Sequence, residues 1–319
     1  MTKKSNPFFL HDVLSLEQYT SSDLLLLFKK TDLIRKLIES GKTPDYLRGK
    51  LATLMFYEPS SRTFSSFAAA IKKLGGQTIE YQNPTQTSSA VKGETIEDST
   101  KVFEAYSDVI IMRHPIAGTA KKAADAATKA PLINAGDGPG EHPTQAFLDL
   151  YTMFKRHGTL NQLKILLVGD LLYGRTVHSL MKGLSLFKGV DVYLMSPSRL
   201  RMPQDIQRYA IHKGMKITEI HSPKDIPKDC DIWYWTRVQK ERFKSRTEYE
   251  KVKLAYVLTK KLIDDRATTH TYFMHPLPRV GEIETAVDSD PRALYLDEQV
   301  KNGMYVRMAL LTLVLRPKS

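Results

Sequence analysis

The sequence predicts an α/β fold of two similar-sized, doubly wound parallel-sheet domains joined by helices. Strand-like apolar runs alternate with amphipathic helix-like segments along the chain, an order typical of parallel sheets with crossover helices. About four to five strands are expected on each side of residues 150–160. With 319 residues and 42% hydrophobic content, the chain is more consistent with two cores than one. The expected domains are 1–150 and 151–299, and a C-terminal helix at about 300–319 is expected to pack back on the first.

The elements of the first half are predicted from short apolar runs and the amphipathic segments between them. The run Lys50–Phe56 has the length of a buried strand, and the helix pattern that follows stops at Gly75 and Gly76, residues that favour helix termination. The predicted strands are Lys50–Phe56, Gln77–Tyr81, Val109–Met112 and Pro131–Asn134, and the predicted helices are Thr63–Leu74, Glu94–Tyr106, Thr119–Thr128 and Pro143–Arg156.

The same alternation continues in the second half. Helix Pro143–Arg156 is expected to join the two domains, and the stretch Ala293–Leu315 is expected to form one helix or two. The other predicted elements are the strands Lys164–Val168, Val190–Met195, Asp231–Trp235 and Thr271–Phe273 and the helices Thr176–Phe187 and Gln207–Lys213.

Composition argues against several classes of function. The formal charge is +12, but the lysines are scattered and no basic run alternates with aromatic residues, so a basic surface is favoured over nucleic-acid binding. The single cysteine, Cys230, excludes an internal disulfide, and a zinc site requires several ligands, so no metal is expected. No apolar run is long enough to span a membrane, and no apolar segment follows the basic N-terminus. A cytoplasmic protein without membrane contact is expected.

Four short arginine-bearing segments each follow a predicted strand. In an open α/β sheet, ligands bind outside the carboxyl ends of the strands. Arginine binds phosphates and carboxylates through a planar fork of N–H donors and stays charged at working pH. Together these segments predict a site for a small, highly anionic substrate pair. They are Ser60–Thr63, Met112–Pro115, Gly174–Thr176 and Thr236–Gln239.

Two loops that run into predicted helices are candidate sites for an anion or a polar substrate. Ser60 and Ser61 open a predicted helix, whose first N–H groups and dipole attract anions; an ordinary capped helix is the alternative. The glycine-rich loop Asn134–Gln145 also runs into a helix, but its spacing is not that of a dinucleotide fingerprint. His142 and Gln145 stand where this second helix begins. Either could bind a polar substrate, although a histidine at a helix start more often has a structural role.

The segment Gly169–Thr176 nearly matches a nucleotide-binding P-loop. However, Arg175 stands in the place of the lysine and Asp170 would put a negative charge among the phosphates. A nucleotide hydrolase is therefore disfavoured. Farther along, Arg237 and Gln239 are expected to face the same way if the chain stays extended. In the stiff loop His275–Arg279, the prolines lack N–H groups but keep carbonyls that can accept from a ligand, and a cis bond before Pro278 is consistent with the sequence.

Taken together, these segments resemble the aspartate carbamoyltransferases from about Phe56 to Leu315. The sister ornithine carbamoyltransferases share the first phosphate loop but carry a cysteine in the loop that here reads His275–Arg279. That difference favours aspartate as the acceptor. The most specific matches are Asn134–Gln145, Gly169–Ser179, Thr236–Arg242 and His275–Val280.

The resemblance implies a transfer of the carbamoyl group of carbamoyl phosphate to L-aspartate, in pyrimidine biosynthesis, without a cofactor. Arg62, Thr63, Arg113 and His142 are the implied catalytic residues. The residues implied to bind carbamoyl phosphate are Ser60, Ser61, Arg62, Thr63, Arg113, His142, Gln145, Pro276, Leu277 and Pro278, and those implied to bind aspartate are Lys92, Arg175, Arg237 and Gln239.

The resemblance also implies a homotrimer with shared sites, to which Ser88 and Lys92 come from the neighbouring subunit. Regulatory chains and larger assemblies are left open. Phe64 departs from the family, which usually has an arginine at this position. A carbamoyltransferase for another amino acid and a non-catalytic family member are the alternatives.

Overall fold

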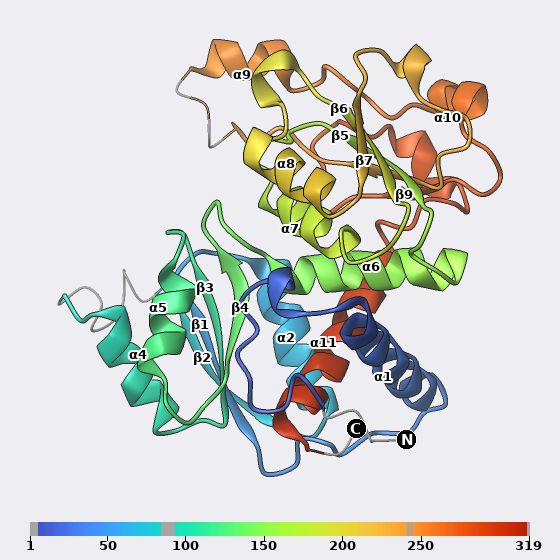
Figure 1. Ribbon diagram of the computed structural model, residues 1–319. Helices are drawn as coiled ribbons and strands as arrows, with labels where there is room; N and C mark the ends of the chain where they lie inside the picture. The colour runs from blue at the N-terminus through green and yellow to red at the C-terminus, as the bar shows by residue number, and fades with distance from the viewer. Residues whose placement is uncertain (1–5, 84–92, 241–242, 244, 318–319) are drawn as a thin grey trace. The chain divides into compact units, whose positions relative to one another are not determined.

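The structure, a computed structural model, describes residues 6–83, 93–240, 243 and 245–317 (Figure 1). The chain divides into two compact units. Unit 1 contains Met1–Leu148 and Asn302–Ser319, and unit 2 contains Asp149–Lys301. The chain passes from one unit to the other inside two helices, α6 (Pro143–His157) and α11 (Glu298–Leu315). The region 293–315, expected to be one helix or two, contains the single helix α11.

Unit 1 is built on a parallel sheet with the strand order β2-β1-β3-β4. Helices α4 and α5 cover one face of this sheet, and α2 and α11 lie on the other (Figure 1). The strands are β1 (Leu51–Phe56), β2 (Gln77–Gln82), β3 (Val109–His114) and β4 (Leu132–Asp137), and the helices wholly in this unit are α1 (Ser21–Glu39), α2 (Ser61–Lys73), α4 (Ile96–Glu104) and α5 (Thr119–Ala126).

The free edge of β4 is extended by a segment near the N-terminus. The Val13 N–H donates to the Leu132 carbonyl (2.8 Å), and the Asn134 N–H donates to the Val13 carbonyl (2.9 Å). The Asp12 carboxylate accepts from the Leu132 N–H at 2.8 Å. These contacts satisfy backbone groups that an edge strand would otherwise expose.

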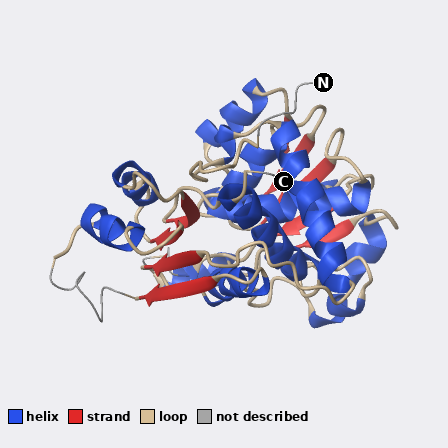
Figure 2. Cartoon of the chain, turned by 90° about the horizontal axis from the view of Figure 1, so that it is seen from below, coloured by secondary structure: helices blue, strands red, loops and turns tan. Residues whose placement is uncertain are grey.

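Unit 2 is built on a second parallel sheet, with the strand order β7-β6-β5-β8-β9. Figure 2 shows helices around the strands of the chain, as the predicted α/β fold requires. The strands are β5 (Lys164–Val168), β6 (Asp191–Met195), β7 (Lys216–Glu219), β8 (Ile232–Trp235) and β9 (Tyr272–Met274), and the helices wholly in this unit are α7 (Arg175–Leu184), α8 (Gln204–His212), α9 (Arg246–Val252) and α10 (Lys260–Arg266).

The strand order places a topological switch point in each sheet. In unit 1 the chain winds from β1 out to β2 and then crosses to β3 on the other side of β1. In unit 2 it winds from β5 out to β7 and then crosses to β8. Ligands of open α/β sheets bind outside the strand ends at such a point. The switch points therefore lie between the loops after β1 and β3 in unit 1, and after β5 and β8 in unit 2.

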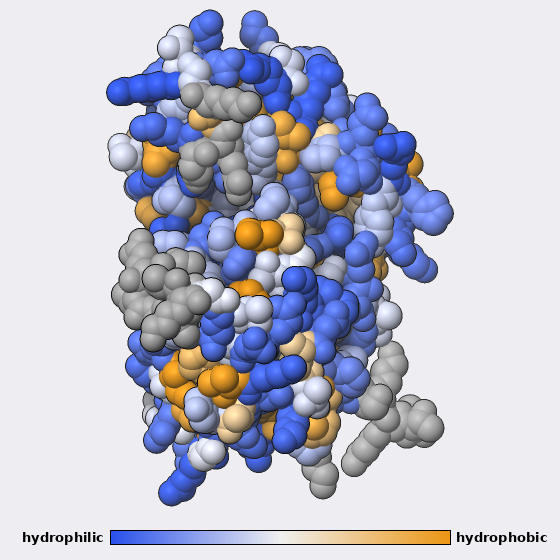
Figure 3. All heavy atoms as spheres, turned by 90° about the vertical axis from the view of Figure 1, so that its left-hand side faces the viewer, coloured by the Kyte–Doolittle hydropathy of each residue, from blue (hydrophilic) through white to orange (hydrophobic). Residues whose placement is uncertain are grey.

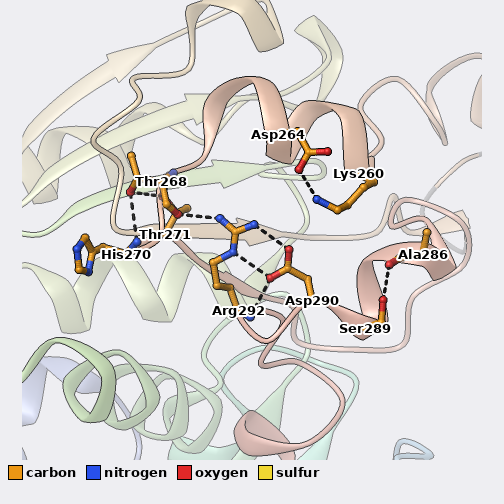
Figure 4. A network of polar contacts seen from close by, with 9 residues as sticks. All are labelled: Lys260, Asp264, Thr268, His270, Thr271, Ala286, Ser289, Asp290 and Arg292. Carbon is orange, nitrogen blue, oxygen red and sulfur yellow. Dashed lines mark hydrogen bonds and ion pairs between the residues drawn. The ribbon is translucent and has the colours of Figure 1, made fainter.

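Strand β9 is anchored at the end away from its following loop. Arg292 binds both carboxylate oxygens of Asp290 (2.9 and 2.7 Å) and donates to the Thr268 carbonyl at 2.8 Å (Figure 4). The Thr268 N–H donates to the Thr271 hydroxyl at 3.1 Å, immediately before β9 begins. These contacts fix where β9 enters the sheet.

Candidate active site

The segment Ser60–Thr63 forms the first turn of α2, directly after β1. Ser60 is the N-cap residue and its hydroxyl makes no capping bond to the helix. Ser61 and Arg62 are exposed, whereas Thr63 is buried. A helix start, whose first N–H groups have no partner within the helix ladder, is suited with a neighbouring guanidinium to hold a phosphate. Phe64, the departure from the family pattern, packs edge-on against Phe56 with ring centroids 5.2 Å apart.

Arg113 lies near the end of β3, across the switch point from β1. It is 8% exposed; its guanidinium binds the Glu58 carboxylate at 2.6 Å and donates to the Ala135 carbonyl at 3.2 Å. Gly136 lies beside it with φ +129°, and a Cβ there would come within 2.7 Å of Arg113 Nη1. A glycine is needed at this position because any side chain would displace the arginine. Arg113 is therefore a buried, fixed cation, and Glu58 neutralises it in this structure.

His142 and Gln145 lie where α6 begins, after the glycine-rich loop that follows β4. The loop is closed on itself, since the Asp137 N–H donates to the Glu141 carbonyl (3.0 Å) and the Gly140 N–H to the Asp137 carbonyl (2.8 Å). The His142 side chain is buried and Gln145 is half-buried. Together with Ser60–Thr63 and Arg113, His142 and Gln145 are the candidate half-site of unit 1, which the sequence predicts.

In unit 2, two loops carrying Arg175 and Arg237 follow β5 and β8, the strands at the switch point. Gly169 follows β5 with φ +112°, and a Cβ there would come within 2.2 Å of the Thr236 carbonyl oxygen. Only glycine permits this close approach. Arg175 is the first residue of α7, and Arg237 is half-buried. Two cations at one sheet edge can bind a substrate with two carboxylates.

Asp170 ties these two loops together. Its carboxylate accepts from the Tyr173 N–H at 2.9 Å and from the Gln239 N–H at 3.3 Å, and the Gln239 side chain donates back to the Tyr173 carbonyl at 2.9 Å. Burial raises the pKa of Asp170, against the opposing effect of these N–H donors and of Arg237. The residue that argues against a P-loop therefore has a structural role: it joins the loops that carry Arg175, Arg237 and Gln239, the candidate half-site of unit 2.

The loop His275–Arg279 follows β9 and is held at both ends. His275 is fully buried against Glu282, with 2.8 Å between Nε2 and a carboxylate oxygen. At the other end the Arg279 guanidinium binds both oxygens of Asp288 and lies over the Tyr295 ring. The Leu277–Pro278 bond is cis, in agreement with the sequence, and Leu277 has φ +55°. The carbonyls of Pro276 and Leu277 are thus carried by a rigid loop.

The predicted residues of unit 1 lie at or after the ends of β1, β3 and β4, and those of unit 2 lie after β5, β8 and β9. Ser88 and Lys92, expected from the neighbouring subunit, lie outside the described residues. Glu58, Asp170 and Glu282 were not foreseen as partners of the site, because their contacts connect loops that only the folded sheets bring together. Within 6–83, 93–240, 243 and 245–317, no cluster of three or more His, Cys, Asp or Glu side chains could hold a metal. Across those same ranges, no helix is both long enough and apolar enough to cross a membrane.

Two family models match the chain in succession. The aspartate/ornithine carbamoyltransferase carbamoyl-P binding domain matches residues 11–155, and the aspartate/ornithine carbamoyltransferase Asp/Orn binding domain matches residues 161–314. Together they cover most of the sequence.

Individual relatives are similar over nearly the whole chain. The chloroplastic aspartate carbamoyltransferase of Arabidopsis thaliana is 44% identical over 98% of this chain and 80% of its own length. The aspartate carbamoyltransferase catalytic subunit of Methanopyrus kandleri is 44% identical over 97% of this chain and 98% of its own. The structure of Trypanosoma cruzi aspartate transcarbamoylase with carbamoyl phosphate and aspartate is 36% identical, covers 99% of this chain and 100% of its own, and has a TM-score of 0.90.

Proposed function

The chain belongs to the aspartate/ornithine carbamoyltransferase family, and from this premise we propose that it transfers the carbamoyl group of carbamoyl phosphate to the amine of L-aspartate. The products are N-carbamoyl-L-aspartate and phosphate, in de novo pyrimidine biosynthesis. The observation that carries the choice of acceptor is the half-site of unit 2, where Asp170 holds the loops of Arg175 and Arg237 together. Aspartate offers these two cations two carboxylates, whereas ornithine would bring one carboxylate and an ammonium group.

In the proposed mechanism, unit 1 binds carbamoyl phosphate. The start of α2, with Ser60, Ser61 and Arg62, holds the phosphate together with Arg113. Thr63, Arg113 and His142 donate to the carbamoyl oxygen, while Gln145 and the carbonyls of Pro276 and Leu277 accept from its NH₂ group. Pro278 keeps this loop in shape. Each fixed donor on the developing oxyanion typically contributes about 3–4 kcal/mol.

The transfer needs no nucleophilic side chain. The aspartate amine attacks the carbamoyl carbon and forms a C–N bond, and the tetrahedral intermediate collapses with cleavage of the carbon–oxygen bond to phosphate. The departing phosphate takes the amine proton. Arg175 and Arg237 bind the two carboxylates of aspartate, assisted by Gln239 and by Lys92, so that holding two anions side by side supplies most of the catalysis.

The proposed assembly is a homotrimer in which Ser88 and Lys92 act in the neighbouring subunit's site. Exposed apolar side chains in unit 1, which include Val102 and Tyr106 at α4, support an interface there. Figure 3 views the molecule from the α4 side and shows apolar surface in its lower part. A cytoplasmic location is proposed because the single cysteine, Cys230, is buried and forms no disulfide, although the Arabidopsis relative is named chloroplastic.

The test measures product formed from carbamoyl phosphate with aspartate and ornithine as parallel acceptors. Wild type is expected to use aspartate alone. Arg237→Ala is expected to raise the KM for aspartate by about a hundredfold, since a charge-assisted contact to carboxylate is lost. Arg246→Ala, which removes an arginine of the same unit that is 84% exposed, is the matched control. It should leave kcat and the KM for aspartate unchanged. Turnover of ornithine or another acceptor, or no turnover by a folded protein, would contradict the proposal.

A further inference from the structure

The hydrogen bonds of His275 determine which ring nitrogen carries the proton. The Leu277 N–H donates to Nδ1 at 2.8 Å, and a backbone N–H can only donate, so Nδ1 must present its lone pair. The proton of the neutral ring is then on Nε2, which lies 2.8 Å from Glu282 Oε1. The second carboxylate oxygen, Oε2, accepts from the Val280 N–H at 2.9 Å. Both oxygens of Glu282 accept, as expected for an ionised carboxylate.

The electrostatics of the pair agree with this assignment. Burial lowers the pKa of His275, and the bond to Glu282 only partly offsets it. Burial raises the pKa of Glu282, but the contacts with His275 and the Val280 N–H outweigh it, and that pKa ends below its usual value. The pair is therefore a neutral imidazole that donates to a carboxylate.

The bond from Leu277 N–H to His275 Nδ1 controls the shape of the loop. Pro276 and Pro278 have no backbone N–H, so the backbone donor of the tripeptide Pro276–Pro278 is the N–H of Leu277. Leu277 has φ +55°, a left-handed conformation that is unfavourable for a non-glycine residue. Without the Nδ1 acceptor, the peptide between Pro276 and Leu277 loses the contact that keeps it in this orientation.

The base of the loop is held by a second set of buried contacts. The His275 N–H donates to Gln299 Oε1 at 3.1 Å, and Gln299 Nε2 donates to Asp149 Oδ1 at 2.7 Å. The Tyr234 hydroxyl donates to the other oxygen of Asp149 at 2.7 Å. This set of contacts fixes the backbone of His275. Glu282 therefore acts on Leu277 through the imidazole ring, which contacts both residues.

We propose that Glu282 and His275 are positioning residues for the transfer: Glu282 keeps the proton of His275 on Nε2, and the resulting Nδ1 acceptor holds the Leu277 peptide so that the Pro276 and Leu277 carbonyls meet the carbamoyl NH₂ group. The inference rests on the proposed function, which assigns these carbonyls to the substrate. The pair touches no reacting atom, so it acts through the loop.

Two substitutions of His275 separate this role from a purely structural one. In His275→Asn the side-chain oxygen can take the place of Nδ1 and accept from the Leu277 N–H, as asparagine does two residues before a donor. In His275→Gln the amide can reach Glu282 but offers no acceptor at the Nδ1 position. Positioning predicts a kcat loss of about a hundredfold for His275→Gln and of about fivefold or less for His275→Asn. If the bond between His275 and Glu282 mattered only for the fold, His275→Asn, which loses that bond, should lose more kcat than His275→Gln, which can keep it.

The substitution Glu282→Gln tests the proton position. The Val280 N–H needs an acceptor, so the amide oxygen is expected to turn toward it, and the amide NH₂ then faces His275 Nε2. Nε2 must accept, the ring proton moves to Nδ1, and Nδ1 then opposes the Leu277 N–H. The expected result is a fall in kcat of about a hundredfold with the KM for carbamoyl phosphate nearly unchanged, because the phosphate is held in unit 1.

The measurements are kcat, both KM values, the melting temperature and the ¹⁵N ring signals of His275. Arg292→Ala is the control: it breaks the carboxylate contact at the opposite end of β9 and should lower the melting temperature without lowering kcat. Wild type should show the Nε2–H form of His275 and Glu282→Gln the Nδ1–H form.

The inference is overturned by an Nδ1–H form in wild type, by His275→Asn losing as much kcat as His275→Gln, or by near-normal turnover in Glu282→Gln. If Glu282→Gln does not fold, the two His275 variants and the wild-type ring signals decide. A wild type inactive with aspartate rejects the proposed function, and the ring signals still test the proton position.

Discussion

The two half-sites present their cations in different ways. In unit 1 the side chain of Arg113 is itself fixed, buried at the end of β3 between Glu58, the Ala135 carbonyl and Gly136. In unit 2 the loops are fixed instead: Asp170 and Gln239 tie together the backbones that carry Arg175 and Arg237. A fixed side chain suits a charge that must meet one small oxyanion, whereas joined loops keep two cations together for the two carboxylates of a dicarboxylate.

The largest expected effect is the loss of the fixed side chain. Arg113→Ala should lower kcat/KM by about 10²–10³-fold, because a preorganised donor to the oxyanion disappears and Glu58 is left without its partner. Steady-state kinetics with both substrates measure the loss. Arg48→Ala, at a side chain of unit 1 that is 83% exposed, should be indistinguishable from wild type. A loss smaller than tenfold for Arg113→Ala would mean that its buried position serves the fold alone.

A smaller effect is expected when the loops of unit 2 are released. Asp170→Asn keeps one acceptor oxygen for two N–H donors, so the loops should move and raise the KM for aspartate by about tenfold. The pKa of Asp170 is raised in the folded state, so the wild type should lose stability as pH rises from about 4 through the folded-state pKa. The melting temperature of Asp170→Asn should therefore rise relative to that of wild type as pH increases over this range.

Kinetics and melting curves from pH 4 to 7 check both statements about Asp170. Asp225→Asn, an exposed position of the same unit, serves as the control. An unchanged KM for aspartate in Asp170→Asn would show that Asp170 does not support the half-site.

The smallest effect is expected for a similar carboxylate tie outside the half-sites. Glu104 of α4 accepts from the N–H groups of Thr128 (2.6 Å), Lys129 and Ala130 (3.0 Å). Burial raises the pKa of Glu104, but these donors outweigh it and lower the pKa overall. Glu104→Gln should destabilise unit 1 by about 1 kcal/mol, or about 2–4 °C in melting temperature, with kinetic constants intact.

The contribution of Glu104 is present above the unfolded-state pKa and is lost as pH falls through the lowered folded-state pKa. Wild type and Glu104→Gln should therefore converge in stability below about pH 4. Lys101→Gln, at an exposed position of the same helix, should leave the melting temperature unchanged. Altered kinetics in Glu104→Gln would show that this tie also supports the half-site.

The central strands and the arginine-bearing segments could be predicted from the sequence because both leave local signals. β1, β3, β5 and β8 are apolar runs, and each arginine stands just past or at the end of one. β7 (Lys216–Glu219) was missed because an edge strand with polar, half-exposed residues has no apolar run. Helix α1 was also not expected, although Thr20 and Asp23 form a capping box at its start.

The supporting residues of the site were not predictable in the same way. Glu282 and His275 are seven residues apart across a loop, and Asp170 reaches Gln239 from another strand end. No spacing rule of helices or strands relates such pairs, since the loop conformations alone bring them together. Sequence patterns therefore indicate which groups face a substrate and leave open which groups hold them in place.

The division of the chain between the units has a consequence for its synthesis. Unit 1 needs α11, whose residues Val306, Leu310 and Val314 are fully buried, and α11 follows all of unit 2 in the sequence. Because a chain emerges from the ribosome N-terminus first, unit 2 can complete its core while unit 1 still lacks one of its helices. The apolar surface that α11 covers in unit 1 must stay exposed throughout that interval, which makes the nascent unit 1 the natural client for a chaperone.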